Sequence, residues 1–548
     1  MSAPCPGDTL ASILDHVPRP LRFGTSGRRG DVVDLTQLEI YLNVRGELDH
    51  LLGLPSSEGG IRPGQAFFLA HDLRPSSTRY VTDQGGRGEI AQAVERAVRD
   101  AGLVPVNLGE IPTPALMAYA FAANCGSIMI TGSHIPFERN GYKTNSARGE
   151  LRKEDEAPID ARVARWRARL LEQSPAESDF DASGRLRDGH RELLAPIAAG
   201  RDAYLSRYLR FFGAGALAGL RVLVYQHSAV GRDLLVDMLG ALGADVVAVG
   251  RSDTFVPIDT EAVDEPTLAA IEALAVDASR AGGRFDALVS TDGDSDRPLL
   301  IALTYDDAGR AHARFFGGDL VGMVVAETLE PDAVVVPVSC NDAIDRGPLA
   351  AVLEPKTRIG SPYVIAGMEQ ARARGRTRVC GWEANGGFLT GSEFAREGRT
   401  LEPLPTRDAF LPLLCVLMRM RAERKPMVAL FDALPRRFSH AGLLRRFPRE
   451  ISQRIVDALA GLPLASAAFG RCFSRELGFG TLTGRDVTDG VRLFFDNGDV
   501  AHVRPSGNAD ELRLYAVADT QHRANAIVRA GTAEPDGILR RLAEEFAA

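Results

Sequence analysis

Two short apolar runs that end directly in polar loops place the strongest constraint on the fold of this chain. Residues 127–130 (SIMI) precede the loop 131–143, and residues 285–290 (FDALVS) precede the loop 291–297. Such runs are typical of buried strands. Open sheets built from strands and helices place their reactive groups beyond the strand ends. The sequence therefore predicts a fold of strands and helices with a functional site at these loops.

The segment 220–249 indicates how the strands are connected. Its apolar residues 220–225 and 245–249 flank a helical stretch, 233–242. A strand–helix–strand order favours a parallel sheet. At 548 residues the chain is too long for one hydrophobic core, and its length predicts three to four domains. A polar region at 172–190 predicts a surface excursion or linker. We predict four domains, at 1–200, 201–312, 313–435 and 436–548.

The loop 131–143 (TGSHIPFERNGYK) carries a hydroxyl group and a candidate proton-transfer group. Ser133 stands just past the predicted strand, between Gly132 and the nearby Pro136, and Lys143 closes the loop. A serine so placed can act as a nucleophile. The alternative is an ordinary polar turn, because Ser and Asn favour turns in any case.

The loop 291–297 carries three carboxylates at alternate positions. These are Asp292, Asp294 and Asp296. When such a loop curls, the side chains can converge on one cation, and oxygen ligands suit Mg²⁺. A calcium-binding EF-hand begins with the same spacing but needs Gly at its sixth position and Glu at its twelfth. Arg297 and Leu303 stand there, which excludes that motif. A solvated acidic turn is the remaining alternative, although three unpaired carboxylates repel one another.

Residues 504–513 (RPSGNADELR) offer a cationic cradle for a phosphate group. They follow a predicted hairpin of strands 491–495 and 500–504, with Asn497-Gly498 as its turn. Arginine can bind phosphate through two hydrogen bonds at once. The candidate binding residues are Arg504, Ser506, Gly507, Asn508 and Arg513. A surface turn with ordinary salt bridges is the alternative.

A serine hydroxyl with a Mg²⁺ site suggests phosphoryl transfer, and the three loops together resemble those of the α-D-phosphohexomutase superfamily. Residues 23–30 (FGTSGRRG), 72–77 (DLRPSS) and 111–114 (IPTP) are similar to its opening F-G-T-x-G-x-R-G, its D-x-R-x-S-S element and its T-P element. The loops at 131–143, 292–297 and 504–513 are similar to its phosphoserine loop, its D-G-D-G-D-R loop and its R-P-S-G-T-E-P-x-x-R loop. The resemblance runs in the expected order along almost the whole chain.

The resemblance implies an α/β architecture of four domains. Three are α/β domains with mixed, largely parallel sheets, and the C-terminal domain is a smaller α+β domain. It also implies an enzyme that interconverts hexose 6-phosphate and hexose 1-phosphate. The intermediates are a phosphoserine at Ser133 and a hexose 1,6-bisphosphate, which also serves as activator. Mg²⁺ would be bound by Ser133, Asp292, Asp294 and Asp296.

Further roles follow from the same resemblance. Arg29 and Lys143 are the candidates for acid–base catalysis or charge stabilisation. The implied substrate-binding residues are Arg297, Glu383, Asn385, Arg504, Ser506, Gly507, Asn508 and Arg513. The variant sequence at 131–137 favours the bacterial phosphomannomutase branch, and mannose phosphate is the expected substrate. The alternatives are a phosphoglucomutase, a phosphoglucosamine mutase, or a sugar-phosphate sensor without catalysis.

The chain also departs from the family pattern, above all in the sugar-binding loop. Where the family usually has G-E-x-S-G-H, residues 382–387 read WEANGG. Glu383 is kept, Asn385 replaces the serine, and Gly387 replaces the histidine. Without the imidazole, a proton-shuttling role at that position is in doubt. Smaller departures are Ser295, Asn508 and Glu511. Because Ser133, the three aspartates and both cradle arginines remain, we interpret the chain as a distinct branch that is still catalytic.

Composition excludes several other classes. The formal charge of −8, without a basic stripe, argues against nucleic-acid binding. Residues 1–20 lack the apolar region of a signal peptide, and no apolar run approaches the length of a membrane span. Six scattered cysteines without a C-x-x-C pair indicate reduced thiols. A dinucleotide site at 213–219 (GAGALAG) is rejected, because these glycines precede their strand rather than follow it. We expect a cytoplasmic monomer or homodimer that binds small sugar phosphates.

Overall fold

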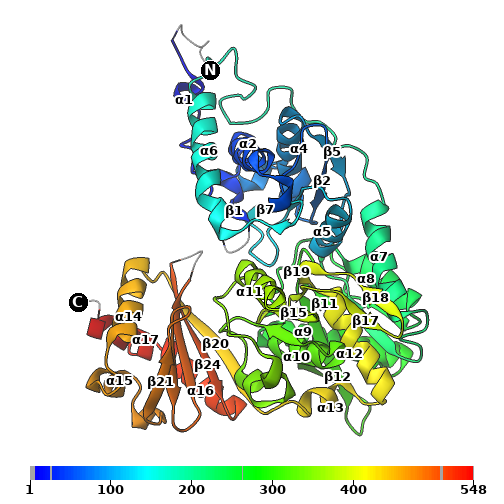
Figure 1. The fold of residues 1–548 in the computed structure, drawn as a ribbon, viewed down its shortest axis with the longest axis vertical. Helices are drawn as coiled ribbons and strands as arrows, with labels where there is room; N and C mark the ends of the chain where they lie inside the picture. The colour runs from blue at the N-terminus through cyan, green and yellow to red at the C-terminus, as the bar shows by residue number, and fades with distance from the viewer. Residues whose placement is uncertain (1–6, 25–26, 262, 507–509, 547–548) are drawn as a thin grey trace. The chain divides into compact units, whose positions relative to one another are not determined.

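The computed structural model describes residues 7–24, 27–261, 263–506 and 510–546. The chain forms two compact units, each built from two stretches of sequence (Figure 1). Unit 1 comprises Met1–Gly318 and Asn385–Met427, and unit 2 comprises Asp319–Ala384 and Val428–Ala548. Each unit therefore joins segments that lie far apart in the sequence.

The first sheet of unit 1 has the strand order β1–β7–β6–β2–β5, with β8 beside β7. The strands are β1 (Arg28–Asp31), β2 (Ala66–His71), β5 (Val104–Asn107), β6 (Ser127–Ile130), β7 (Arg139–Ser146) and β8 (Gly149–Glu150). β2 runs parallel to β5 and β6, whereas β7 runs antiparallel to β1 and β6. The strand predicted from the apolar run before Ser133 is β6, and all four of its residues are buried.

Four helices pack on this sheet and on one another. They are α2 (Gln37–Gly53), α4 (Ile90–Asp100), α5 (Thr113–Ala122) and α6 (Lys153–Leu171). α2 lies against α4 and α6 as well as β7, so that nearly all of its side chains are buried. Its start is fixed by Thr36, whose side chain accepts a hydrogen bond from the backbone N–H of Glu39. The apolar residues of α2, α4, α6 and the sheet form the core of this region.

The second sheet of unit 1 has the strand order β10–β9–β11–β12–β13. The strands are β9 (Arg221–Tyr225), β10 (Asp245–Val249), β11 (Ala287–Thr291), β12 (Pro298–Tyr305) and β13 (Ala311–Phe315). β9 runs parallel to β10 and β11, and β12 runs antiparallel to β11 and β13. Helix α8 (Arg232–Ala241) connects β9 to β10, which confirms the predicted strand–helix–strand unit. The other helices here are α7 (Ala199–Phe212) and α9 (Glu265–Gly282).

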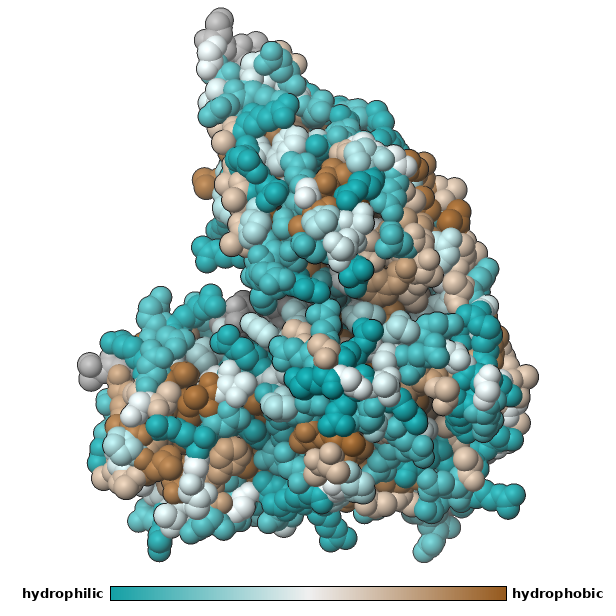
Figure 2. Space-filling view, viewed as in Figure 1, coloured by the Kyte–Doolittle hydropathy of each residue, from teal (hydrophilic) through white to brown (hydrophobic). Residues whose placement is uncertain are grey.

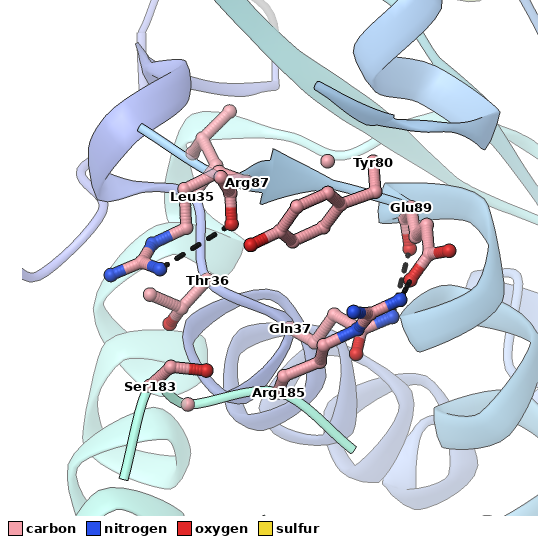
Figure 3. A pocket seen from close by; sticks show the side chains of 11 residues that line it. Leu35, Thr36, Gln37, Tyr80, Arg87, Glu89, Ser183 and Arg185 are labelled. Carbon is pink, nitrogen blue, oxygen red and sulfur yellow. Dashed lines mark hydrogen bonds and ion pairs between the residues drawn. The ribbon is translucent and has the colours of Figure 1, made fainter. Parts of the chain in front are cut away.

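The polar stretch between α6 and α7 packs against the core around the first sheet of unit 1. Its residues Phe180 and Leu186 form an isolated bridge and are buried in the core. Arg185 donates a hydrogen bond to Glu89 at 2.9 Å and lies 4.5 Å above the ring of Tyr80 (Figure 3). A pocket here measures about 10 Å³, roughly the room that one water molecule needs. This pocket is therefore too small for a sugar phosphate.

The second stretch of unit 1 contributes short strands and one long helix. They are β16 (Phe388–Thr390), β17 (Phe394–Arg396), β18 (Arg399–Leu401), β19 (Leu404–Asp408) and α12 (Phe410–Glu423). β19 pairs antiparallel with β16. The Asp408 side chain accepts a hydrogen bond from Tyr204 at 2.6 Å and another from Tyr208, both on α7. These buried contacts fasten the end of β19 to the first stretch of unit 1.

Unit 2 contains a pair of parallel strands and a five-stranded antiparallel sheet. The parallel strands are β14 (Ala333–Val335) and β15 (Val379–Trp382), accompanied by α10 (Gly318–Leu329) and α11 (Ser361–Ala373). The antiparallel sheet has the order β20–β24–β23–β22–β21. Its strands are β20 (Phe438–Arg445), β21 (Leu482–Asp486), β22 (Val491–Phe495), β23 (Val500–Pro505) and β24 (Glu511–Ala518). Its helices are α14 (Arg449–Gly461), α15 (Ala467–Cys472), α16 (Gln521–Thr532) and α17 (Ile538–Phe546).

The predicted hairpin before the phosphate cradle is confirmed, because β22 and β23 pair antiparallel around a turn that contains Gly498 at φ 83°. The predicted α/β class with mixed sheets is confirmed as well. The division into four domains stays a prediction. The remaining short elements are α1 (Leu10–Ile13), α3 (Pro75–Thr78), β3 (Tyr80–Val81), β4 (Arg87–Gly88), α13 (Met427–Asp432), η1 (Val32–Asp34), η2 (Ser56–Glu58), η3 (Thr82–Gln84), η4 (Asp342–Arg346), η5 (Pro348–Val352) and η6 (Arg475–Leu477).

Hydrophilic residues predominate on the face drawn in Figure 2, and hydrophobic residues form small separate patches there. Within the part of the chain that the structure describes, no helix has both the length and the apolar character that a membrane crossing requires.

Candidate active site

The serine loop and the acidic loop meet inside unit 1. Ser133 follows β6, Asp292 follows β11, and both side chains are fully buried. The Ser133 hydroxyl donates a hydrogen bond to Asp292 Oδ2 at 2.6 Å. Two loops more than 150 residues apart in the sequence thus place a serine hydroxyl against a carboxylate.

Ser133 adopts a backbone conformation that a residue with a side chain rarely adopts, with φ 55°. Arg74 stabilises this turn through hydrogen bonds to its backbone. Its guanidinium donates hydrogen bonds to the carbonyl oxygens of Ser133 at 3.0 Å, Pro136 at 2.9 Å and Arg139 at 2.9 Å. A side chain at Gly132 would place its Cβ only 2.6 Å from Arg74 Nε. The loop therefore wraps closely around one arginine.

Asp72 completes this support. Its carboxylate accepts hydrogen bonds from Thr131 Oγ1 at 2.8 Å, Ser77 Oγ at 2.8 Å and the backbone N–H of Arg74 at 3.0 Å. The residues of the motif at 72–77 therefore support the serine loop through hydrogen bonds. Sequence analysis detected the motif but did not predict this role.

The acidic loop gathers its carboxylates as predicted. One oxygen from each of Asp292, Asp294 and Asp296 lies within 4.8 Å of the others, and all three residues are buried. The Oδ1 atoms of Asp294 and Asp296 are buried without a hydrogen-bond donor among the described residues. Burying such oxygens is costly unless a cation or a donor compensates them. The donor set therefore fits a hard divalent cation such as Mg²⁺.

Backbone donors and side chains from other segments shape the acidic loop. Asp292 Oδ1 accepts hydrogen bonds from the backbone N–H groups of Asp296 and Arg297, both at 3.1 Å. Thr113, at the start of α5, donates to Asp294 Oδ2 at 2.6 Å. Ser295 has φ 57°, which explains why the family motif has glycine at that position.

Four cationic side chains of unit 1 surround the carboxylates. These are Arg29, Lys143, Arg297 and Arg407. Lys143 Nζ lies 2.6 Å from Asp294 Oδ2 and 2.8 Å from Asp296 Oδ2. Burial and the charge of Arg297 lower the pKa of Arg29 to about 10, with a further contribution from Arg407. The four cations outnumber the three carboxylates by one formal charge, and their donor groups suit a bound phosphate.

His134, the neighbour of Ser133 in the chain, is uncharged among these cations. Its Nδ1 lies 3.4 Å from Ser133 Oγ. Burial holds the pKa of His134 well below its ordinary value, and the nearby charges of Arg297 and Arg29 lower it further. A neutral imidazole can accept or donate a hydrogen bond here without adding charge.

One buried carboxylate fastens the two strands that carry Arg29 and Lys143. Glu47, on α2, accepts hydrogen bonds from Arg28 Nε at 2.8 Å, Tyr142 Oη at 3.2 Å and Thr144 Oγ1 at 2.6 Å. Successive side chains of a strand point to opposite faces, so these contacts lie on the face away from Arg29 and Lys143. Sequence analysis missed Glu47. The only signal was an acidic residue within a helix that is otherwise buried.

The predicted sugar-loop residues fall on both sides of the boundary between the units. Glu383, in unit 2, directly follows β15 and is buried. Asn385, in unit 1, uses Oδ1 to accept the backbone N–H of Gly387 at 3.0 Å. The amide therefore shapes its own loop, a role that the prediction of substrate binding did not include.

The described residues of the predicted phosphate cradle lie in unit 2. Arg504 and Arg513 are cross-strand partners on β23 and β24. Arg504 Nε donates to Asp489 Oδ1 at 2.9 Å, and the backbone N–H of Ser506 donates to the carbonyl oxygen of Glu511 at 2.9 Å. The predicted binding residues Gly507 and Asn508 lie outside the described residues, as do Thr25 and Ser26 of the opening motif.

Comparison with known proteins identifies the family. Residues 20–169 match phosphoglucomutase/phosphomannomutase, alpha/beta/alpha domain I, and residues 317–438 match domain III of the same family. A phosphomannomutase of Sinorhizobium fredii is 38% identical over 516 residues, which cover 93% of this chain and 98% of the relative. A phosphomannomutase of Salmonella muenchen is 37% identical over 515 residues, covering 93% and 94%. The chain therefore belongs to the phosphoglucomutase/phosphomannomutase family of phosphohexomutases, which are isomerases.

Solved structures agree at the level of the fold. A phosphoglucomutase/phosphomannomutase family protein from Burkholderia thailandensis has a TM-score of 0.63 at 17% identity, covering 95% of this chain and 97% of its own. An N-acetylphosphoglucosamine mutase of Aspergillus fumigatus, in complex with GlcNAc-6P and magnesium, has a TM-score of 0.53 at 15% identity. The match covers 97% and 98% of the two chains.

Proposed function

We propose that this enzyme interconverts mannose 6-phosphate and mannose 1-phosphate by way of a phosphate carried on Ser133. The observation that carries the proposal is the contact of Ser133 Oγ with Asp292 at 2.6 Å, inside a buried cluster of three carboxylates and four cations. A hydroxyl in this position can accept a phosphoryl group and return it.

The three carboxylates, together with the phosphate on Ser133, would hold Mg²⁺. The fit rests on buried oxygens of Asp294 and Asp296 that accept no hydrogen bond from the described residues. When bound, the ion neutralises charge on the transferring phosphoryl group. The magnesium named for the Aspergillus fumigatus structure belongs to that protein and agrees with this assignment.

The transfer runs in two balanced steps. In the first, a hexose hydroxyl oxygen bonds to the phosphorus on Ser133 and gives its proton to a base, while the bond from phosphorus to Ser133 Oγ breaks and Oγ takes up a proton. The product is a hexose 1,6-bisphosphate. In the second, Ser133 Oγ gives up its proton as it bonds to the other phosphorus, and the hexose oxygen released there takes up a proton. Added hexose 1,6-bisphosphate would act as activator by restoring the phosphate on Ser133.

Lys143 and Arg29 are the groups proposed to support these steps. Lys143 Nζ lies within hydrogen-bond distance of two of the carboxylates, where it can transfer a proton or stabilise charge. Arg29 adds a buried positive charge on the neighbouring strand. Because the reacting groups are buried, water is kept from the phosphoserine, which favours transfer to sugar over hydrolysis.

Substrate recognition is proposed for seven residues besides Arg297 of the acidic loop. They are Glu383, Asn385, Arg504, Ser506, Gly507, Asn508 and Arg513. Carboxylate and amide groups suit sugar hydroxyls, and paired arginines suit the distal phosphate. Mannose phosphate is favoured because the relatives at 37% and 38% identity are named phosphomannomutases. A phosphoglucosamine mutase is the second candidate, because such an enzyme from Frankia alni is 28% identical over 539 residues.

The test compares kcat/KM for mannose 1-phosphate, glucose 1-phosphate and glucosamine 1-phosphate, with intact-mass analysis of the protein. We expect mannose 1-phosphate to rank first and one phosphate to map to Ser133 after incubation with a hexose 1,6-bisphosphate. Glucosamine 1-phosphate in first place would overturn the substrate assignment. No phosphate on Ser133, with Mg²⁺ present, would overturn the mechanism and favour a sensor.

A further inference from the structure

Gly387 stands where the family's sugar-loop motif has histidine, and the structure shows what its missing side chain makes room for. A Cβ at Gly387 would lie 2.6 Å from Cδ, 2.7 Å from Cγ and 2.9 Å from Cβ of Arg407. Real Cβ atoms do not approach other atoms so closely. Gly387 does not have a positive φ, so the backbone conformation does not require glycine. The glycine is explained by the space that the arginine stem occupies.

Arg407 reaches from this space into the acidic loop. Its Nε lies 3.0 Å and its Nη2 2.8 Å from Asp296 Oδ2. The same oxygen accepts the ammonium group of Lys143 at 2.8 Å. Arg407 is nearly fully buried. One carboxylate oxygen thus holds a permanent cation beside the candidate proton-transfer group.

The strand that carries Arg407 is held rigidly. The next residue, Asp408, is fixed by Tyr204 and Tyr208 of α7 and accepts the backbone N–H of Phe410 at 2.8 Å. The preceding residue, Thr406, donates to Glu150 Oε1 at 2.9 Å. Because neighbours of Arg407 on both sides are anchored, its guanidinium is preorganised for Asp296.

We propose that the side chain of Arg407 occupies the space beside Gly387 and that Arg407 acts as a positioning residue. Its guanidinium fixes Asp296 and adds a permanent positive charge to the site. This inference rests on the proposed function. Arginine stays protonated at ordinary pH, so Arg407 does not replace a histidine as a proton carrier. Relative to the family motif, a histidine that can titrate is replaced by an arginine that stays charged and positions Asp296. The proposed proton transfer remains with Lys143.

The charge of Arg407 gives the proposal a distinctive test. A cation beside three carboxylates weakens the binding of a second cation. Arg407→Ala should therefore bind Mg²⁺ at least threefold more tightly, measured by calorimetry on the purified protein. Its kcat should fall about 100-fold, as for the loss of a preorganised donor, with KM changed less than threefold. General damage to the site would instead weaken Mg²⁺ binding.

Arg407→Lys and Gly387→Ala sharpen the test. Lysine restores the charge without the two-pronged geometry, so it should return Mg²⁺ affinity to the wild-type value and recover kcat about tenfold over Arg407→Ala. Gly387→Ala should displace the arginine stem and lower kcat about tenfold. In the Arg407→Ala background the same alanine should change kcat less than twofold, because the stem that it would meet is gone.

Arg437→Ala is the matched control. Arg437 is a buried arginine of unit 2 that donates to Asp519 and to the carbonyl oxygen of Gly498. Its loss should lower stability and leave Mg²⁺ affinity unchanged. The proposal is overturned if Arg407→Ala keeps kcat within threefold of wild type, if it weakens Mg²⁺ binding, or if the Gly387→Ala loss persists in the double variant. Absence of mutase turnover in the wild type would overturn the proposed function, and the Mg²⁺ measurements would still decide the role of Arg407.

Discussion

The serine loop and the acidic loop have similar backbone turns but are held in place by different kinds of contact. Each follows a buried strand and turns through a non-glycine residue of positive φ, Ser133 at 55° and Ser295 at 57°. The serine loop is wrapped around one side chain, Arg74, which donates to several of its carbonyl oxygens. The acidic loop is held by contacts spread over several segments, including its own backbone and Thr113.

The difference follows from what each loop must present. In the proposed mechanism the serine loop presents one oxygen to a phosphoryl group, so its carbonyl groups can turn toward a central arginine. The acidic loop, in the same proposal, leaves carboxylate oxygens without donors for a cation, so its support comes from donors at the periphery. The comparison predicts that the serine loop depends on single residues more than the acidic loop does.

The largest expected effect is the loss of the nucleophile itself. Ser133→Ala removes the only oxygen proposed to carry the phosphate, and we expect kcat to fall at least about 10⁴-fold. Steady-state turnover and intact mass after incubation with hexose 1,6-bisphosphate measure it. Turnover within about tenfold of wild type would contradict the phosphoserine mechanism.

Arg74→Ala should remove the centre of the serine loop. Arg74 Nε lies 3.4 Å from Asp72 Oδ2, and both side chains are buried. Breaking a buried ion pair by deleting one partner costs about 3–5 kcal/mol, and the loop carbonyls also lose their donors. Denaturant unfolding of the variant measures the loss. A destabilisation below about 1 kcal/mol would show that the serine loop, like the acidic loop, is supported by distributed contacts.

The acidic loop should respond to mild acid through His227. His227 Nε2 contacts the carbonyl oxygen of Thr291 at 2.8 Å, and burial lowers the pKa of His227 to about 4. The unfolded chain takes up this proton near pH 6.5. The stability contributed by the neutral imidazole is therefore complete above about pH 6.5 and is lost as pH falls toward 4, by about 3 kcal/mol.

Unfolding free energies of the wild type and His227→Gln, measured between pH 4 and 7, isolate this contribution. Glutamine keeps a donor for Thr291 but does not titrate. We expect the wild type to lose stability more steeply than the variant. Parallel curves would show that His227 does not couple the loop to pH.

Thr113→Val tests one peripheral support of the acidic loop. Valine keeps the shape of threonine but removes the donor to Asp294 Oδ2, and a hydrogen bond to a charged group contributes about 2 kcal/mol. We expect a loss of this size, smaller than that of Arg74→Ala, in the same unfolding assay. An equal or larger loss would remove the proposed contrast between the loops.

The smallest expected effect concerns backbone conformation. Ser295→Ala and Ser295→Gly both remove the hydroxyl that contacts Gly231 and Thr291, but only glycine adopts positive φ without strain. Glycine should therefore be the more stable variant by about 1 kcal/mol. A more stable alanine variant would show that strain at this turn is negligible.

The sequence alone determined the features that depend on near neighbours. The apolar runs before Ser133 and Asp292 form strands, because short apolar runs that end in polar loops are typical of buried strands. The Asn497-Gly498 turn fixed a hairpin, and the spacing of the three aspartates brought their oxygens together within one loop. These outcomes need only local geometry.

The tertiary structure decided the contacts between distant segments. Arg74 reaches the serine loop about 60 residues away, Glu47 meets Tyr142 and Thr144, and Arg407 meets Asp296 across 111 residues. No pattern in the sequence marks these partners, because each contact depends on which elements pack together and how closely. Gly387 shows the limit most clearly. In the sequence it is a lost histidine, and in the folded protein it is the space that Arg407 fills.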